Sequence, residues 1–308
     1  MISTIVIGTR GSKLARAQAR MVEKALHEKW PDLTIETEII RTSGDESHSQ
    51  AGNLRHGRKG LFTAAIEKAL LARDVDLAVH SAKDLPSKLT RGTEIAAVLP
   101  RALMDDVLVL KRAGGLAALE GKATIATGSV RRKRQLAWKH PGPAIVDLRG
   151  NVPTRLRKFA ENNWEAIVLA RAGLERLGFL LTQNEINFEG QQFFIEVLPR
   201  EIFLPAGGQG IIALQIRADD ENIRAIVNPV NDHETLLCLR AEREFLRLLQ
   251  GDCSSPVGVL ATTKNGIMKM RAQVFQDGSG APRAGRVEGV CDEGERLAAQ
   301  LLKQINGE

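Results

Sequence analysis

The sequence predicts an α/β protein with two doubly wound domains in series and a small α+β domain at the C-terminal end. Apolar strand-like runs alternate with amphipathic helix-like runs, and the alternation restarts near residue 105. After residue 256, three strand-like stretches are joined at TKNG and DGSG, which favour hairpin turns. A chain of 308 residues also exceeds the usual size of one core, so we expect two or three domains.

The first domain begins with the apolar run TIVIGTR, and Ser12 can cap the helix that follows, which Trp30-Pro31 would end. This strand–helix–strand rhythm predicts a mostly parallel sheet with helices on both faces. The Gly-rich turn and strand at 204–217 are expected to return the chain to this sheet, giving a discontinuous domain of residues 1–100 plus 204–225. The expected strands are 4–8, 34–40, 76–80, 93–100, and the second helix is 60–75.

The second domain, 101–203, repeats the rhythm, and the third, 226–308, departs from it. A long helix over 231–250 opens the third domain, with Asn231 and Glu234 spaced as a capping box. The strand-to-loop units of the second domain are 105–110, 123–129, 143–151 and 164–173, the expected strands of the third are 257–262, 266–276 and 284–291, and a final helix covers 294–305.

Composition narrows the class of partner. The net charge of +6 allows nucleic acid or an anionic small molecule, but only 4% of residues are aromatic and Tyr is absent, which disfavours base stacking. No apolar run is long enough to span a bilayer and no signal peptide is evident, so a cytoplasmic location is expected. Three scattered cysteines without CxxC spacing predict neither a disulfide framework nor a metal site.

Basic and hydroxyl side chains follow the predicted strands, where α/β sheets bind their ligands. Nucleotide-binding fingerprints are absent, and arginine, which recognises carboxylates in a bidentate manner, outnumbers lysine. We therefore expect a ligand with several carboxylates. The residues after the strands are Arg10, Ser12, Lys83, Asp84, Thr127, Gly128, Ser129, Arg131, Arg132, Arg149, Gly150, Asn151, Arg155, Arg171 and Arg176.

TGSVRR (127–132) illustrates the choice between two interpretations. Two arginines in the first turn of a helix oppose the helix dipole, which is favourable when an anion lies between them. The alternative is a solvated basic face formed with Lys133 and Arg134. Recurrence of the pattern at several strand ends favours the anion site.

Two other residues stand out in their surroundings. Asp84 is a carboxylate in a cationic region and suits a general acid or a group that stabilises a cation, although a surface ion pair is the plain alternative. Cys253 lies in the turn GDCSSPVG, and its thiol is a candidate nucleophile or attachment point or simply a tolerated small residue. The polar segment 43–59 is predicted to be a mobile lid, and Cys238 is predicted to be core.

Eight motifs together make the chain resemble the hydroxymethylbilane synthase family, also called porphobilinogen deaminases. In the family's order they are IGTRGSKLA (7–15), KGLFTAAIEKALL (59–71), DLAVHSAKDLP (76–86), TGSVRRKRQL (127–136), LRGNVPTRL (148–156), VLARAGLERLG (168–178), LPAGGQGIIAL (204–214) and AEREFLRLLQGDCSSPVG (241–258).

The resemblance implies two domains similar to type II periplasmic binding proteins and a third that carries a dipyrromethane cofactor on Cys253. It implies a monomeric enzyme that condenses four porphobilinogen molecules onto this primer, with Asp84 acting at the pyrrole nitrogens. From composition and spacing, no metal, nucleic acid or membrane partner is expected. The implied cofactor-binding residues are Lys83, Thr127, Gly128, Ser129, Arg131, Arg132, Asn151 and Arg155, and the substrate-binding residues are Arg10, Ser12, Lys59, Phe62, Arg149, Gly150, Arg176, Gln209 and Gly210.

The chain departs from the family pattern in several places. Gly128 stands where a second serine is usual, an expected arginine is missing from the hinge RALMDDVLV (101–109), and ALQ (213–215) replaces the usual AIE. A rival hypothesis from another class is a non-catalytic two-domain protein that binds a polycarboxylate, since the same architecture serves as a solute receptor. Such a receptor needs neither the turn cysteine nor an aspartate among arginines.

Overall fold

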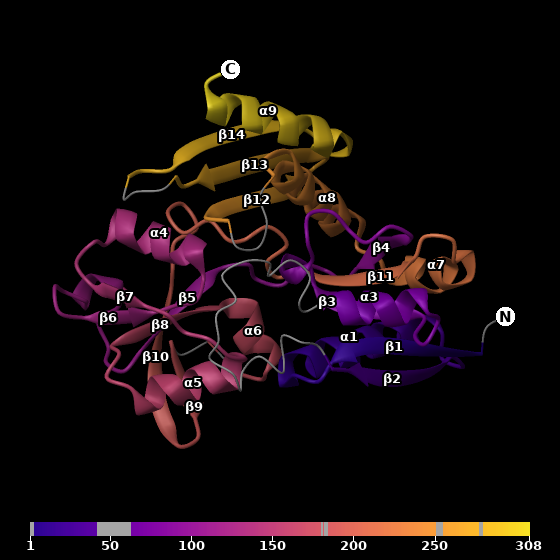
Figure 1. Cartoon of the computed structure of the whole chain (residues 1–308), viewed down its shortest axis with the longest axis horizontal. Helices are drawn as coiled ribbons and strands as arrows, with labels where there is room; N and C mark the ends of the chain where they lie inside the picture. The colour runs from indigo at the N-terminus through magenta and orange to yellow at the C-terminus, as the bar shows by residue number, and fades with distance from the viewer. Residues whose placement is uncertain (1–2, 42–62, 180, 182–183, 251–254, 277–279) are drawn as a thin grey trace.

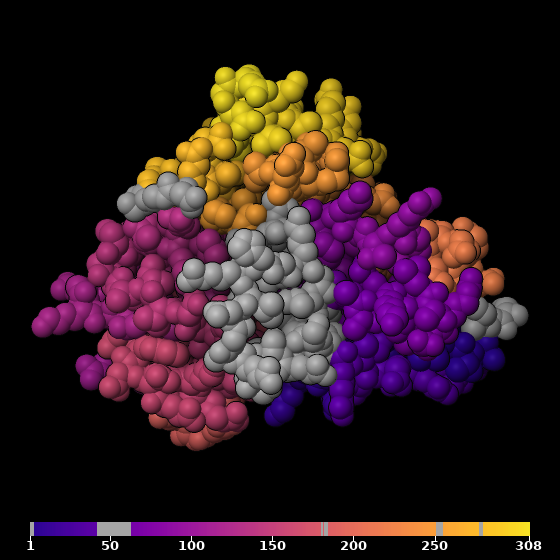
Figure 2. Space-filling view, in the orientation of Figure 1, coloured from indigo at the N-terminus to yellow at the C-terminus, as the bar shows by residue number. Residues whose placement is uncertain are grey.

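A computed structural model describes residues 3–41, 63–179, 181, 184–250, 255–276 and 280–308. Three lobes, each built on its own β-sheet, make up the described part of the chain (Figure 1). The C-terminal lobe lies across the other two at the top of the view (Figure 2). Ligand sites in such an arrangement are expected where the lobes face one another.

The first sheet has the strand order β2-β1-β3-β11-β4. Helix α1 (Lys13–Lys29) begins at Ser12, whose Oγ accepts a hydrogen bond from Ala15 N at 3.2 Å, and its apolar face packs on one side of the sheet. Helix α3 (Ala64–Leu71) packs against the other side and ends before the predicted limit of 75, because Arg73 takes a positive φ of 63°, while the first part of the prediction, 60–62, lies outside the described residues. The strands are β1 (Thr4–Arg10), β2 (Thr34–Ile40), β3 (Leu77–Ser81), β4 (Thr93–Val98) and β11 (Ile212–Arg217).

The second sheet has the strand order β7-β6-β8-β5-β10-β9. Phe159 of α5 and Leu136 of α4 belong to separate apolar clusters, one on each face of this sheet. The strands are β5 (Asp106–Leu110), β6 (Thr124–Ala126), β7 (Ala144–Val146), β8 (Ala166–Ala170), β9 (Glu185–Phe188) and β10 (Gln191–Val197), and the helices are α4 (Val130–Lys139), α5 (Val152–Glu161) and α6 (Arg171–Arg176).

Both sheets are mixed, but β1, β2, β3 and β4 share one direction, so the predicted mostly parallel sheet of the first domain is confirmed. In the first sheet β11 runs antiparallel to β3 and β4, and in the second β5 and β10 run antiparallel to their neighbours. The antiparallel strands flank the two connections between the lobes, 99–105 and 198–211. The strands by which the chain enters a lobe from these connections, β5 and β11, run against the direction of the βαβ units.

The third lobe consists of helix α8 (His233–Leu248), a meander of β12 (Val257–Lys264), β13 (Ile267–Val274) and β14 (Arg283–Val290), and helix α9 (Gly294–Asn306). Its core contains Cys238, as predicted. The predicted capping box is wrong, because Asp232 caps α8 by accepting from Thr235 N at 2.9 Å. Asn231 instead accepts from Val98 N at 3.0 Å and ties the helix to β4.

A buried ion pair holds the three lobes together at the connections. The fully buried carboxylate of Glu242, in α8, pairs with Arg101 of the first connection at 2.7 Å. It also accepts from Gly208 N of the second connection at 2.6 Å and from Ala261 N of β12 at 2.8 Å. Asp105, in the hinge that lacks the expected arginine, forms a second link, to Arg200 of the other connection at 2.7 Å.

Candidate active site

Three adjoining pockets lie at the carboxyl ends of the strands. The first is lined by Lys83, Ser129 and Arg131, together with Arg243 and Ser255 of the third lobe. The second is lined by Arg10, Ser12, Gln18, Ser81 and Asp84, and the third by Gln18, Ser81, Lys83, Arg132, Arg155 and Arg176. Shared lining residues join the three pockets into one region that draws on all three lobes.

Helix starts place the hydroxyl and amide groups of this region. Ser129 caps α4 by accepting from Arg132 N at 3.4 Å, and Asn151 caps α5 by accepting from Thr154 N at 3.0 Å. Thr127 is buried and accepts from Ser129 N at 3.3 Å. These residues therefore set the direction in which each helix begins, as Ser12 does for α1.

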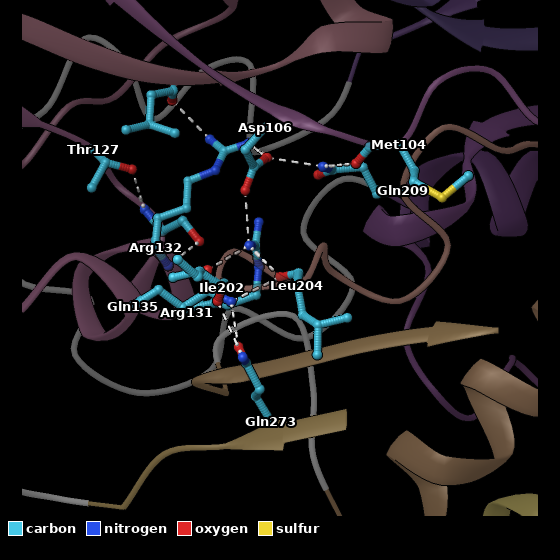
Figure 3. Close-up of polar contacts among 12 residues, drawn as sticks. Met104, Asp106, Thr127, Arg131, Arg132, Gln135, Ile202, Leu204, Gln209 and Gln273 are labelled. Atoms are coloured by element: carbon cyan, nitrogen blue, oxygen red, sulfur yellow. Dashed lines mark hydrogen bonds and ion pairs between the residues drawn. The ribbon is translucent and has the colours of Figure 1, made fainter. Parts of the chain in front are cut away.

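Two arginines of α4 share one buried carboxylate, as Figure 3 shows. Arg131 and Arg132 reach Asp106 at 2.8 and 2.7 Å, and their exposed fractions are 3% and 5%. Burial alone would raise the pKa of Asp106, but the two guanidinium groups outweigh it and hold that pKa well below its usual range. One carboxylate between two cations leaves the cluster with a net positive charge.

The same cluster is anchored to the third lobe. Arg131 donates to Leu204 O at 2.7 Å and to Gln135 Oε1 at 2.9 Å, and Gln135 donates to Gln273 Oε1 at 2.9 Å (Figure 3). Because Gln273 belongs to β13, these bonds fix the start of α4 relative to the lobe that contains Cys253 in its sequence.

Lys83 lies between the lobes, on the short 3-10 turn Ala82–Asp84. Burial and the nearby charge of Arg132 lower its pKa from 10.5 to about 8. Gln209 accepts from Lys83 Nζ at 3.4 Å and donates to Asp106 Oδ1 at 2.9 Å, so it bridges the lysine and the arginine cluster. A lysine whose charge is disfavoured in this way gains an electrostatic partner when an anion binds.

Arg155 and Arg176 add two more cations to the third pocket. Burial lowers the pKa of each to about 10, and Arg132 adds to the effect at Arg155. The buried Nε atoms of Arg131, Arg132 and Arg176 have no hydrogen-bond acceptor among the described residues. Buried donors without partners, in a region with excess positive charge, fit a ligand that carries several carboxylates.

The structure brings together much of the predicted set but not all of it. Arg149 is exposed and lies 3.6 Å from Asp147, and Gly150 and Asn151 form the turn into α5 without lining the three pockets. Gly210 has a φ of 86°, and Gly128 has no room for a serine, since a Cβ there would lie 2.5 Å from Leu148 O. Lys59, Phe62, Cys253 and the predicted lid at 43–59 lie outside the described residues.

Sequence reasoning missed Asp106, Gln18 and His80. Asp106 stands at the start of the apolar strand DVLVL, and an acidic residue there is a signal for a buried ion pair. Gln18 exchanges hydrogen bonds with Ser81 at 2.8 and 3.1 Å, but as one polar residue in an amphipathic helix it gave no sign of its position. His80 lines the second pocket beside Asp84.

Two other kinds of site are absent from the described part of the chain. No group of three or more His, Cys, Asp or Glu side chains there is placed to hold a metal ion. Among the same residues, no helix combines the length and the apolar character that a membrane crossing requires.

Fold and site together define a class: an α/β protein with a cationic site between its lobes, suited to a polycarboxylate, and one carboxylate, Asp84, within that site. The family models that match are "Porphobilinogen deaminase, dipyromethane cofactor binding domain" over residues 5–225 and "Porphobilinogen deaminase, C-terminal domain" over residues 236–306. The chain belongs to the porphobilinogen deaminase family, and its site is that of a family whose members hold a dipyrromethane cofactor.

Relatives and solved structures are similar to different degrees. The porphobilinogen deaminases of Moorella thermoacetica and Pelotomaculum thermopropionicum are each 42% identical to this chain, over 99% of it and 95% of the relative. The methionine-binding protein MetQ is 13% identical, with a TM-score of 0.45, over 76% of this chain and 92% of that one. The predicted fold class is confirmed by the two mixed sheets with their helices and the small third lobe.

Proposed function

We propose that the chain is a transferase that joins four porphobilinogen molecules, with loss of ammonia, and releases linear hydroxymethylbilane by hydrolysis, a step of tetrapyrrole biosynthesis. The observation that carries this proposal is the arrangement of Lys83, Arg132, Arg155 and Arg176 around one pocket, with Asp84 in the adjoining one. Porphobilinogen has acetate and propionate groups that suit the cations and a pyrrole ring that becomes cationic on losing ammonia. Both features match the charges present.

The cationic residues would hold the carboxylates of the growing chain. Arginines on rigid helix starts can bind carboxylates in a bidentate manner, and Lys83 adds a point charge between the lobes. Asp106 pairs with both Arg131 and Arg132 while leaving a net positive charge for the ligand. The substrate-binding group of the proposal comprises Arg10, Ser12, Lys59, Phe62, Arg149, Gly150, Arg176, Gln209 and Gly210, and the cofactor-binding group comprises Lys83, Thr127, Gly128, Ser129, Arg131, Arg132, Asn151 and Arg155.

Asp84 would stabilise positive charge. When the carbon–nitrogen bond of porphobilinogen breaks, the pyrrole nitrogen shares its electron pair and the ring carries positive charge. A carboxylate beside that nitrogen lowers the energy of the cation and can hold the ring's N–H proton. This role explains why an acidic side chain stands within a pocket that also contains Arg10.

The donor set fits a dipyrromethane, a molecule of two pyrroles with acetate and propionate groups. The unpartnered Nε atoms of Arg131 and Arg132 and the capped start of α4 can bind such carboxylates, and we propose that Cys253 carries the group through a thioether. When bound, the dipyrromethane supplies the pyrrole carbon to which substrate units are added. The protein's part is to orient its carboxylates and to keep its charge balanced.

Intact mass spectrometry tests the attachment. Protein purified from a porphobilinogen-producing host should exceed the mass of its sequence by two linked pyrrole units, and Cys253→Ala should remove the excess and abolish turnover. Cys291→Ala, which removes another thiol of the third lobe, is the control and should keep the added mass. An unmodified wild-type mass would contradict the proposal and favour the non-catalytic polycarboxylate-binding protein.

Binding of carboxylates should change the charge of Lys83. Its pKa is lowered to about 8 in the free site, so the amine loses its proton as the pH rises through 8, whereas a bound carboxylate restores the pKa toward 10.5. Porphobilinogen binding to Cys253→Ala protein should therefore take up protons between pH 8 and pH 10.5 and none near pH 6. Calorimetry in two buffers of different protonation enthalpy measures the uptake.

Lys83→Met provides the control for that titration. The variant should bind more weakly, and its binding should show no proton uptake at pH 9. Equal uptake by Lys83→Met and the parent protein would assign the protons to another group and contradict the role of Lys83.

We further propose that the protein acts in the cytoplasm as a monomer without nucleic acid, with domain limits at 1–100 plus 204–225, 101–203 and 226–308. The net charge of +6 with few aromatic residues supports a small anionic substrate over nucleic acid. The return of β11 to the first sheet supports a discontinuous first domain. Light scattering of the purified protein tests the monomeric state.

A further inference from the structure

The pocket that contains Asp84 has two polar groups that the proposed mechanism does not use. His80 and Thr63 line it, with exposed fractions of only 5% and 1%. His80 Nε2 and Thr63 Oγ1 have no hydrogen-bond partner among the described residues. Buried polar atoms without partners are rare, so a group that binds in this pocket is expected to contact them.

The hydrogen bonds beneath the pocket bear on whether His80 donates or accepts a hydrogen bond. Gln215, on the neighbouring strand β11, interacts with His80 through its side chain. Both amide hydrogens of Gln215 are already donated, to Glu67 Oε1 at 2.7 Å and to Thr93 Oγ1 at 2.8 Å. The Gln215 carbonyl oxygen has no hydrogen-bond partner among the described residues, and a neutral imidazole carries one proton, so one of the two ring nitrogens of His80 is a bare acceptor.

The surrounding charges keep the imidazole neutral. Burial lowers the pKa of His80 to about 4, against the opposing effects of Glu67 on α3 and of Gln215, and Arg10 on β1 lowers it further. Asp84, on the turn after β3, lines the same pocket. At neutral pH the ring therefore offers one hydrogen-bond acceptor, beside a carboxylate, and no positive charge.

We propose that His80 is a binding residue for the aminomethyl nitrogen of porphobilinogen, the group that leaves as ammonia. This inference rests on the proposed function and adds a residue to its site. The substrate's ammonium group donates a hydrogen bond to the bare ring nitrogen of His80, which orients the carbon–nitrogen bond. That bond breaks with its electron pair moving to nitrogen, ammonia departs with its three hydrogens, and the positive charge passes to the pyrrole, where Asp84 stabilises it.

Position 215 sets the basicity of this acceptor. This chain has Gln215 at the position where the family's usual AIE motif has a glutamate. Because residue 215 is an amide, Glu67 is the one carboxylate among the side chains hydrogen-bonded to it. A second carboxylate in contact with His80 would favour the protonated ring, which has no acceptor left. The substitution at 215 therefore keeps His80 in its accepting form to lower pH.

A leaving-group comparison tests the contact. We expect His80→Leu to lower kcat/KM for porphobilinogen by about tenfold or more, the usual effect of losing a hydrogen bond to a charged group. The same variant should lower kcat/KM much less for the analogue in which a hydroxymethyl group replaces the aminomethyl group. His80→Gln, which keeps a hydrogen-bond acceptor, should recover much of the loss.

Thr90→Val is the matched control. Thr90 Oγ1 donates to Glu67 Oε2 at 2.7 Å, so this variant disturbs the same buried group without touching the pocket, and its ratio for the two substrates should equal that of the wild type. Equal losses for both substrates in His80→Leu would overturn the inference and would point to a carboxylate contact or a structural role. A wild-type protein that releases no ammonia from porphobilinogen would instead refute the proposed function itself.

Gln215→Glu supplies a readout independent of substrate choice. The pKa of His80, followed by NMR of the imidazole, should rise from about 4 by more than one unit. The acid limb of the pH profile of kcat/KM should move upward with it, while the dipyrromethane mass is retained. A raised His80 pKa with an unmoved acid limb would contradict the binding role.

Discussion

Asp84→Asn is expected to lower kcat by about 10²-fold or more while leaving the dipyrromethane mass in place. Asparagine has nearly the same size as aspartate but lacks the negative charge that would balance the cationic pyrrole. The cations that line the neighbouring pocket, including Lys83 and Arg132, are unchanged in this variant, so binding of carboxylates should persist. Ammonia release under single-turnover conditions measures the effect.

A matched control for that variant is Asp74→Asn. Asp74 is an exposed aspartate of the same lobe that lines none of the three pockets, and its replacement should leave kcat within about twofold. Near-normal turnover in Asp84→Asn would refute a catalytic role for this carboxylate. Loss of the added mass in Asp84→Asn would show that the residue is needed earlier, for assembly of the cofactor.

Glu242→Leu is expected to destabilise the protein by about 3–5 kcal/mol. The change removes a fully buried carboxylate and leaves Arg101, whose side chain is 8% exposed, without its partner at 2.7 Å. It also leaves the N–H groups of Gly208 and Ala261 without their acceptor. Urea denaturation measures the loss, and the unfolding of the third lobe should separate from that of the others, because Glu242 joins all three.

Two further variants sharpen this prediction. Glu244→Gln breaks an ion pair with the exposed Arg247 on the same helix and should change the free energy of unfolding by about 1 kcal/mol or less. The double variant Arg101→Met/Glu242→Leu removes both charges and should recover part of the stability lost by Glu242→Leu alone. A double variant as unstable as the sum of its two single variants would contradict the view that the pair acts as a unit.

Local patterns predicted the elements well and their pairing less well. Ser12 and Ser129 cap helices because a short polar side chain before an apolar run satisfies free N–H groups, and this depends only on neighbours in sequence. The sequence predicts Asn231 as the N-cap of α8, whereas Asp232 is the N-cap in the structure. The two residues are equally suitable by their local sequence. The side chain of Asn231 instead accepts a hydrogen bond from Val98 N, a residue that is distant in sequence.

The sequence by itself determined the alternation of strands and helices, the gathering of cations at strand ends, and, through eight motifs, membership of a family. These properties rest on local patterning and on residue types that carry specific chemistry. Tertiary structure decided which charged groups remain available to bind a ligand. Asp106 is 26 residues from Arg132, and only the folded sheet places its carboxylate between two arginines. It also decided that His80 is neutral, because its burial comes from strands that meet only in the fold.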